Sequence, residues 1–178
     1  MKITYYVAIS SDGFIAREDG DVSWLHDTNI DMADTGYDEF FADIDGLVMG
    51  RSTYDVVFQY GSWPYGDKPT WVCTSQELRG LDGANLRVVG TVADVVREAA
   101  SEGIEHLWLV GGGKLASSFI EEGGLSHLSL SEMPIELGAG IPLLARHRLE
   151  ELSIADEELT GKKGFRQREL VLRTEVAG

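Results

Sequence analysis

Three consecutive glycines stand between a buried strand and a helix in the second half of the chain. The apolar run 107–110 predicts a strand covered on both faces, and Gly111, Gly112 and Gly113 lead directly into a helical pattern. Glycine lets a ligand approach the backbone closely, and the free N–H groups and dipole of a helix N-terminus attract an anion. The stretch 106–120 therefore predicts a binding site for a nucleotide pyrophosphate. The alternative is that the glycines only turn the chain tightly between two packed elements.

A second junction of the same kind follows the apolar strand predicted at 46–49. Gly50 ends this strand, and Arg51, Ser52 and Thr53 come next. The planar guanidinium could pair with a phosphate, while the two hydroxyls could cap the helix and share its N-terminus with the anion. A plain helix cap with a surface arginine would be the better explanation if this junction stood alone. Two such junctions in one chain favour a dinucleotide.

The composition favours a small-molecule ligand. The 178 residues contain 15 Lys and Arg against 30 Asp and Glu, a net charge of −15, which repels both nucleic acid and the anionic face of a membrane. Cys73 is the single cysteine and the four histidines are scattered, so no intrachain disulfide and no metal site is expected. We expect one domain over residues 1–178, located in the reducing cytoplasm, without a leader peptide or a membrane span.

The elements that must position the glycines alternate between strands and helices. Apolar runs predict strands at 3–9, 46–49, 70–73, 86–89 and 107–110. Helical spacing lies between them, at 31–44, 54–58, 92–99 and 114–120. The last third reads as strands only, at 125–133 and in an antiparallel hairpin of 148–159 and 165–176 joined by a loop at 160–164. This order predicts a mixed sheet with helices on both faces and a hairpin at its edge, with the first strand placed centrally.

The first third of the chain is acidic. No Lys or Arg lies between Arg17 and Arg51, whereas ten acids do, and most of these are expected on a solvated face. A substrate group lying against this segment is therefore not expected to be a phosphate or a carboxylate. Trp24 and Leu25 follow a flexible loop here, and the residues alone fit a core plug and the wall of a ligand cleft equally well.

Four motifs together resemble the dihydrofolate reductase superfamily. They keep the family's order and spacing and cover nearly the whole chain: Ala8 to Ala16 (AISSDGFIA), Val48 to Thr53 (VMGRST), Val110 to Leu115 (VGGGKL) and Pro134 to Gly138 (PIELG). Within the superfamily, the chain is most similar to the branch related to the C-terminal reductase domain of the bacterial riboflavin-biosynthesis deaminase-reductase. The resemblance implies a three-layer α/β/α fold with a central mixed, mostly parallel sheet. It also implies an NADPH-dependent reductase of a small heterocyclic or carbonyl substrate, pteridine- or aminopyrimidine-like.

The resemblance assigns most of these motifs to NADPH. Ala8 and Ile15 would line the nicotinamide. Phosphate groups would be held by Gly50, Arg51, Ser52 and Thr53. The adenosine 2′-phosphate would lie near Thr74 and Ser75. The pyrophosphate would be held by Gly111, Gly112, Gly113, Lys114 and Leu115. Hydroxyls and an arginine suit a 2′-phosphate, which an acid would repel, so NADPH is favoured over NADH.

The residues expected at the substrate site differ from those of both branches of the superfamily. Folate reductases carry a carboxylate shortly after the tryptophan that matches Trp24, where this chain has Asn29, with Asp27 the nearest acid. The riboflavin branch carries basic residues in the helix matching 31–44, where this chain has none. Our hypothesis is that Trp24 contacts the substrate and that Asp27 supplies a proton from an apolar cleft, assisted by Ser131, which matches a substrate-side hydroxyl of the folate reductases. The alternative is that Asp27 is one more solvated acid.

Two other interpretations remain open at this point. Gly111, Gly113 and Ala116 fit the G-x-G-x-x-A fingerprint of a Rossmann dehydrogenase, with Glu132 about 20 residues further on. That fingerprint normally opens the first strand–helix unit, whereas here it comes late. A non-catalytic NADPH-binding module of the same fold is the other interpretation, because the family carboxylate and the substrate-side cations are absent. The C-terminal strands also allow a two-fold homodimer without requiring one.

Overall fold

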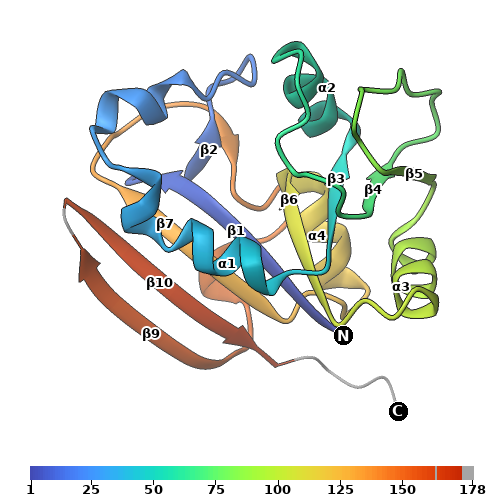
Figure 1. The fold of residues 1–178 in the computed structure, drawn as a ribbon. Coiled ribbons are helices and arrows are strands. Elements are labelled where there is room, and N and C mark those ends of the chain that lie inside the picture. The colour runs from blue at the N-terminus through green and yellow to red at the C-terminus, as the bar shows by residue number, and fades with distance from the viewer. Residues whose placement is uncertain (163, 174–178) are drawn as a thin grey trace.

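An eight-stranded sheet runs through the molecule in the order β5-β4-β3-β6-β1-β7-β10-β9 (Figure 1). The computed structural model of the chain describes residues 1–162 and 164–173. The strands of this sheet are β1 (Lys2–Ser10), β3 (Gly46–Gly50), β4 (Thr70–Cys73), β5 (Leu86–Val89), β6 (His106–Gly111), β7 (His127–Met133), β9 (Ile154–Lys162) and β10 (Phe165–Leu172). A separate two-stranded ribbon pairs β2 (Phe14–Ala16) with β8 (Ile141–Pro142), a pairing that the sequence patterns do not predict.

The sheet is parallel up to β7 and antiparallel in its C-terminal part. Neighbours from β5 to β7 all run parallel, whereas β10 is antiparallel to both β7 and β9. β1 lies between β6 and β7, inside the sheet. The predicted mixed, mostly parallel sheet with a C-terminal hairpin is therefore confirmed.

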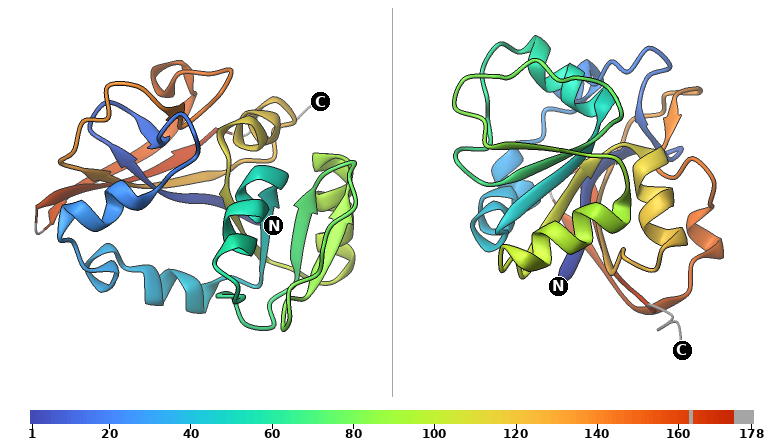
Figure 2. Two further views of the ribbon diagram at one scale, coloured as in Figure 1. Left: turned by 90° about the horizontal axis from the view of Figure 1, so that it is seen from above. Right: turned by 90° about the vertical axis from the view of Figure 1, so that its right-hand side faces the viewer.

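Helices cover both faces of the sheet (Figures 1 and 2). They are α1 (Tyr37–Asp43), α2 (Arg51–Gln59), α3 (Val92–Ser101) and α4 (Gly113–Glu121). Successive side chains of a strand point to opposite faces, so Leu107 and Leu109 of β6 pack with α3 and α4, while Trp108 packs with α1 and α2. No helix in the described residues has the length and apolar character needed to cross a membrane.

The helix predicted over 31–44 is wrong as a single element. A 3₁₀ helix, η2 (Met32–Thr35), and α1 share this stretch, and Gly36 separates them with a left-handed φ of 79°. A residue in this conformation ends a helix and redirects the chain. The apolar residues of α1 still pack against the sheet as the spacing predicts; they are Tyr37, Phe40 and Phe41.

The C-terminal strands have other bounds than the sequence predicts. β9 begins at Ile154 rather than at residue 148, because a 3₁₀ helix, η3 (Leu149–Glu151), precedes it. β9 then continues to Lys162, where the sequence predicts a loop, and β7 starts at His127 rather than at residue 125. β10 ends at Leu172; residues 174–176, predicted to extend it, and residue 163 of the predicted loop lie outside the described residues.

Candidate functional site

The two glycine junctions meet at one edge of the sheet. β3 and β6 are parallel neighbours with Met49 opposite Gly111, so both strands end together, at the edge that faces upward in Figure 1. A Cβ on Gly50 would lie 3.9 Å from the Gly111 carbonyl oxygen and 4.0 Å from the Gly112 nitrogen. A Cβ on Gly111 would lie 3.2 Å from Oγ1 of Thr53. We call Gly50, Thr53, Gly111 and Gly112 together the glycine edge.

Helices α2 and α4 both begin at the glycine edge without a side-chain cap. Their N-cap residues are Gly50 and Gly112, and within the described residues no side-chain cap accepts a hydrogen bond from their first turns. By contrast, Oγ1 of Thr91 caps α3 by accepting a hydrogen bond from the N–H of Asp94 at 3.1 Å. Uncapped first turns keep their N–H donors and the positive dipole end available to an anion. The glycine edge therefore offers an anion open backbone and two uncapped helix N-termini, which is what the predicted pyrophosphate site requires.

Gly113 has a different reason to be glycine. A Cβ at this position would lie 2.5 Å from the carbonyl oxygen of Pro142 and 3.0 Å from that of Leu143. The Gly113 carbonyl also accepts a hydrogen bond from the N–H of Ala145 at 3.2 Å. Tight packing against Pro142 of β8 and Leu143 is therefore one reason for glycine at this position, and its contact with a pyrophosphate stays a prediction.

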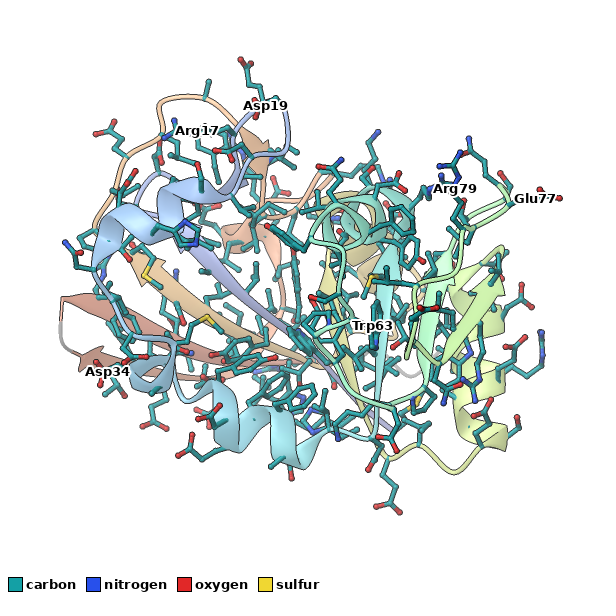
Figure 3. The ribbon with its side chains drawn as sticks, turned by 45° about the horizontal axis from the view of Figure 1, so that its top comes forward. Arg17, Asp19, Asp34, Trp63, Glu77 and Arg79 are labelled. Atoms are coloured by element: carbon teal, nitrogen blue, oxygen red, sulfur yellow. The ribbon has the colours of Figure 1, made fainter. Side chains whose placement is uncertain are left out.

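Arg51, predicted to hold a phosphate, is bonded to protein groups. Its Nε donates to Oδ1 of Asp55 at 2.8 Å, and its Nη1 donates to Oε1 of Gln76 at 3.1 Å and to the carbonyl of Glu77 at 3.2 Å. The two Nη1 bonds tie the first turn of α2 to the loop that follows β4, in which Figure 3 labels Glu77 and Arg79. Arg51 therefore positions this loop, and its own contact with a phosphate stays a prediction.

The remaining cofactor residues assigned from the resemblance lie on elements next to the glycine edge. They are Ala8 on β1, Ile15 on β2, Ser52 in the first turn of α2, Thr74 and Ser75 after β4, and Lys114 and Leu115 in the first turn of α4. Ser52, Ser75 and Lys114 are exposed, whereas Oγ1 of Thr74 accepts a hydrogen bond from the N–H of Gln76 at 3.1 Å. Their contacts with NADPH stay predictions.

Asp12 joins two of the four motifs that lie far apart in the sequence. Its carboxylate accepts hydrogen bonds from the Ser10 hydroxyl at 2.6 Å and from the N–H groups of Leu137 at 3.1 Å and Gly138 at 2.7 Å. Burial alone would raise the pKa of Asp12, but the hydrogen bonds from Ser10, Leu137 and Gly138 outweigh it and hold the pKa below its usual range. The motifs 8–16 and 134–138 therefore meet through a structural contact.

Replacing Asp12 by alanine is expected to lower the free energy of unfolding by about 1 kcal/mol at pH 7, the usual cost of removing a side chain that accepts backbone N–H bonds. Because the folded-state pKa lies below the unfolded value, this stabilisation is complete above the unfolded pKa and disappears as the pH falls through the folded one, below about pH 4. Urea unfolding of both proteins from pH 7 to pH 3 measures the difference. Asp82→Ala, at an exposed loop acid, is the control; a stability difference between Asp12→Ala and the unchanged protein that does not vary with pH would contradict the account.

A pocket of about 220 Å³ lies between the sheet and α1. Side chains of β1, β7 and β10 form its floor, and residues of η2 and α1 form its wall. The ring of Tyr6, on the floor, stacks on Phe40 of α1 with 4.4 Å between ring centroids and 13° between planes. We call this the α1 pocket.

The residues predicted on the substrate side do not come together. Asp27 is exposed on the 3₁₀ helix η1 (Ser23–Thr28), so the apolar surroundings that the proton-donor hypothesis requires are absent. Ser131 is buried on β7 and donates to Oε1 of Gln167 at 2.7 Å, and no hydrogen bond joins it to Asp27 in the described part of the chain. Trp24 is fully buried against Met133 and Phe165, and its Nε1 has no partner among the described residues.

Two other reactive side chains are in structural roles. Nε2 of His106 lies 2.8 Å from Oγ1 of Thr4, and its Nδ1 lies 2.8 Å from the Asp43 carboxylate. Burial lowers the pKa of His106 and outweighs the opposing effect of Asp43, so the ring is neutral near pH 7. Burial raises the pKa of Cys73 to about 12, which keeps its thiol protonated and a weak nucleophile.

Residues 61–161, more than half of the chain, match the family model described as the RibD C-terminal domain. The chain is 33% identical over 144 residues to the uncharacterized protein YwjB of Bacillus subtilis (strain 168), an alignment that covers 80% of this chain and 82% of that protein. It is 28% identical over 153 residues to the uncharacterized protein YyaP of the same organism, covering 80% of this chain and 79% of YyaP.

Solved structures of the same fold agree with this match. A putative riboflavin biosynthesis protein from Shewanella sp. PV-4 superposes with a TM-score of 0.78 at 27% identity, over 97% of this chain and 99% of that one. A diaminohydroxyphosphoribosylaminopyrimidine deaminase/5-amino-6-(5-phosphoribosylamino)uracil reductase from Thermotoga maritima has a TM-score of 0.73 at 13% identity, over 97% of this chain and 56% of that one. The latter likeness concerns the fold alone.

These matches decide between the two dinucleotide folds that the glycines allow. Glu132, the acid that a Rossmann site would use, is ion-paired with Arg166 on the neighbouring strand β10. The strand order, the C-terminal hairpin and the family model agree with the dihydrofolate reductase-like alternative. The chain belongs to the RibD C-terminal domain family.

Proposed function

We propose that the protein is an NADPH-dependent reductase of a small heterocyclic or carbonyl substrate. The observation that carries the proposal is the meeting of Gly50 with Gly111 and Gly112 where two uncapped helices begin. Open backbone beside two helix N-termini suits a ligand with adjacent negative groups, as a pyrophosphate is. Membership in the RibD C-terminal domain family supports the reductase reaction, since a solved protein of this fold is a 5-amino-6-(5-phosphoribosylamino)uracil reductase.

The chain's own residues would bind and orient both reactants. When bound, NADPH would supply the hydride. The glycine edge would hold its pyrophosphate, and Arg51 would keep the loop with Thr74 and Ser75 in place for the 2′-phosphate. Ala8, at the nicotinamide, lies two residues from Tyr6 on the same face of β1, roughly 7 Å away. The α1 pocket thus lies next to the nicotinamide position, where a substrate ring must lie for hydride transfer.

The proton that completes the reduction must come from a group other than Asp27. Because Asp27 is exposed, we do not retain it as a donor from an apolar cleft. Ser131 stays on the substrate side of this proposal, since it lies opposite Ala8 on β7 and bonds to Gln167, which lines the α1 pocket.

Replacing Gly50 by alanine is expected to weaken NADPH binding about tenfold or more, which corresponds to about 1.4 kcal/mol. The added Cβ has only ordinary contacts at 3.9 and 4.0 Å, and the φ of −80° suits any residue, so the fold is expected to keep its stability. The new methyl group would occupy the space between the two junctions that the pyrophosphate needs. Quenching of tryptophan fluorescence during NADPH titration measures the affinity.

Gly90→Ala is the matched control, because Gly90 also follows a parallel strand and a Cβ there meets nothing within 4 Å. Equal NADPH affinity of Gly50→Ala and the unchanged protein would place the cofactor elsewhere. NADPH that binds at this edge but is not oxidised in the presence of pteridines, aminopyrimidines or small carbonyl compounds would instead identify a non-catalytic NADPH-binding module.

A further inference from the structure

We infer that Glu169 of β10, and not an acid near Trp24, is the carboxylate that selects the ligand of the α1 pocket, and that this ligand is a flat heterocycle with N–H donors and without a phosphate. The inference uses the proposed function only for the reaction that follows binding. It rests on the register of three strands, on one hydrogen-bond network and on the charges around the pocket.

The strand register brings Glu169 onto the pocket floor. Tyr6, Ser129 and Glu169 are direct neighbours on β1, β7 and β10, so their side chains share the sheet face covered by α1. All three line the α1 pocket. The next row toward the glycine edge consists of Ala8, Ser131 and Gln167. A ring held by Glu169 would therefore point its far side at Ala8, where the nicotinamide is expected.

A hydrogen-bond network on this floor ends at the Glu169 carboxylate. The Ser131 hydroxyl donates to Oε1 of Gln167 at 2.7 Å. Nε2 of Gln167 donates to Oγ of Ser129 at 2.9 Å and to Oε1 of Glu169 at 2.7 Å. The Ser129 hydroxyl donates to the same Oε1 at 2.6 Å. Because an ionised carboxylate only accepts, Glu169 fixes the direction of every bond in the network.

The network leaves acceptors, and no donors, for a ligand. Both N–H groups of Gln167 and the hydroxyl hydrogens of Ser129 and Ser131 are used inside the network. Oε2 of Glu169 accepts no hydrogen bond within the described residues. The Tyr6 hydroxyl is also committed, because it donates to Oγ1 of Thr35 at 2.8 Å. A ligand bound beside Glu169 must therefore bring its own N–H or O–H hydrogens to this network.

The charges around the pocket disfavour a phosphate. Lys2 is the cation among the lining residues, and it lies four residues from Tyr6 on β1, roughly 13 Å away. His127 also lines the pocket, but burial lowers its pKa, so the ring is neutral near pH 7. The wall contributes no cation, since no Lys or Arg occurs between Arg17 and Arg51. Glu169 would repel a phosphate group bound beside it.

The wall of the pocket suits a planar ring. Phe40 of the wall and Tyr6 of the floor line the pocket and stack on each other, so a ligand ring would meet this pair at its edges, an arrangement that aromatic rings favour. A flat ring placed there could direct amino groups at Oε2 of Glu169. A charge-assisted hydrogen bond of this kind is about twice as strong as one between neutral groups.

Two probes of the same shape and opposite hydrogen-bonding character test the inference. 2,4-Diaminoquinazoline presents amino groups where quinazoline-2,4-dione presents carbonyl oxygens. We expect the unchanged full chain to bind the diamino compound at least about tenfold more tightly than the dione, and Glu169→Gln to lose about tenfold of the diamino affinity. The amide oxygen of the Glu169→Gln variant would still accept the two internal hydrogen bonds, so this variant is expected to fold, which its melting temperature checks. Glu169→Ala is the second variant.

Glu158→Gln is the matched control, because Glu158 lies opposite Glu169 on β9 and is exposed like it, but is not one of the residues that line the α1 pocket; the diamino affinity of this variant should not change. Undiminished binding by Glu169→Gln, stronger binding of the dione, or no diamino binding at millimolar concentration would each overturn the inference. Competition by ribose 5-phosphate would overturn the exclusion of phosphates. NADPH titration of the same proteins separates the two proposals. NADPH binding without binding of the diamino compound rejects only the pocket inference. Binding of the diamino compound without NADPH binding rejects only the proposed reductase function.

Discussion

Truncation of Trp108 to alanine is expected to remove about 3–5 kcal/mol from the free energy of unfolding, the usual cost of deleting a buried tryptophan side chain. Trp108 is 6% exposed, and its ring lies 5.5 Å from Tyr65 and 5.6 Å from Phe40, measured between centroids. Its Nε1 also donates to the Tyr6 carbonyl at 3.2 Å. The cavity would open beneath α1, so the wall of the α1 pocket should lose its order together with the stability.

Urea unfolding followed by circular dichroism measures this change. Tyr60→Ala is the control, since Tyr60 is 65% exposed and exposed positions rarely change stability by more than about 0.5 kcal/mol. A loss below about 1 kcal/mol for Trp108→Ala would mean that α1 does not depend on the contact with β6.

Replacement of Gly113 by alanine is expected to destabilise the fold by about 1–3 kcal/mol, the range found for overpacked sites. Alanine favours a helix by up to about 1 kcal/mol over glycine, which would act in the opposite direction. The clash should prevail, because the new Cβ would lie 2.5 Å from a backbone oxygen of Pro142, and backbone atoms cannot move away by changing rotamer. The start of α4 or the segment after β8 must shift, and NADPH affinity should fall with it.

Gly80→Ala is the matched control for Gly113→Ala. A Cβ at Gly80 meets nothing within 4 Å, and Gly80 does not have a positive φ, so its unfolding free energy should change by less than about 0.5 kcal/mol. Equal stability of the two variants would show that the 142–143 segment does not press on the start of α4.

The glycine edge could be predicted from the sequence because it depends on local patterns. An apolar run followed by glycines and a helical period determines where each strand and helix lies, and parallel strands of one sheet present their C-terminal ends at the same edge. Gly50 and Gly111 are thus brought together by rules that act within about ten residues of each.

Contacts between distant segments explain what the sequence patterns do not predict. The packing of Gly113 against the carbonyl of Pro142 is one such contact, which the local pattern of glycines does not reveal. The bonds of Arg51 to Gln76 and to the Glu77 carbonyl could not be predicted, because these partners lie 25 and 26 positions away. The exposure of Asp27 depends on the path of the chain from β2 to α1, which no periodic pattern determines.

Glu169 and Gln167 were missed for a related reason. The alternation of β10 places both on one face, where Gln167 is 5% exposed, and a buried glutamine is a recognisable signal of a polar network. The register between β10 and β7, which pairs Glu169 with Ser129, decides whether this face lies toward α1 or away from it. Register between strands 40 positions apart comes from packing of the whole sheet and not from either strand alone.

The central claim, that a dinucleotide binds at the glycine edge, is tested most directly by amide hydrogen exchange with and without NADPH. The uncapped first turns of α2 and α4, residues 51–53 and 113–115, should exchange more slowly when NADPH is present. The first turn of α3, residues 92–94, is an internal control, because Thr91 already caps it and its exchange should not change. Exchange at 51–53 and 113–115 that saturating NADPH leaves unchanged would contradict the cofactor site and the reductase built on it.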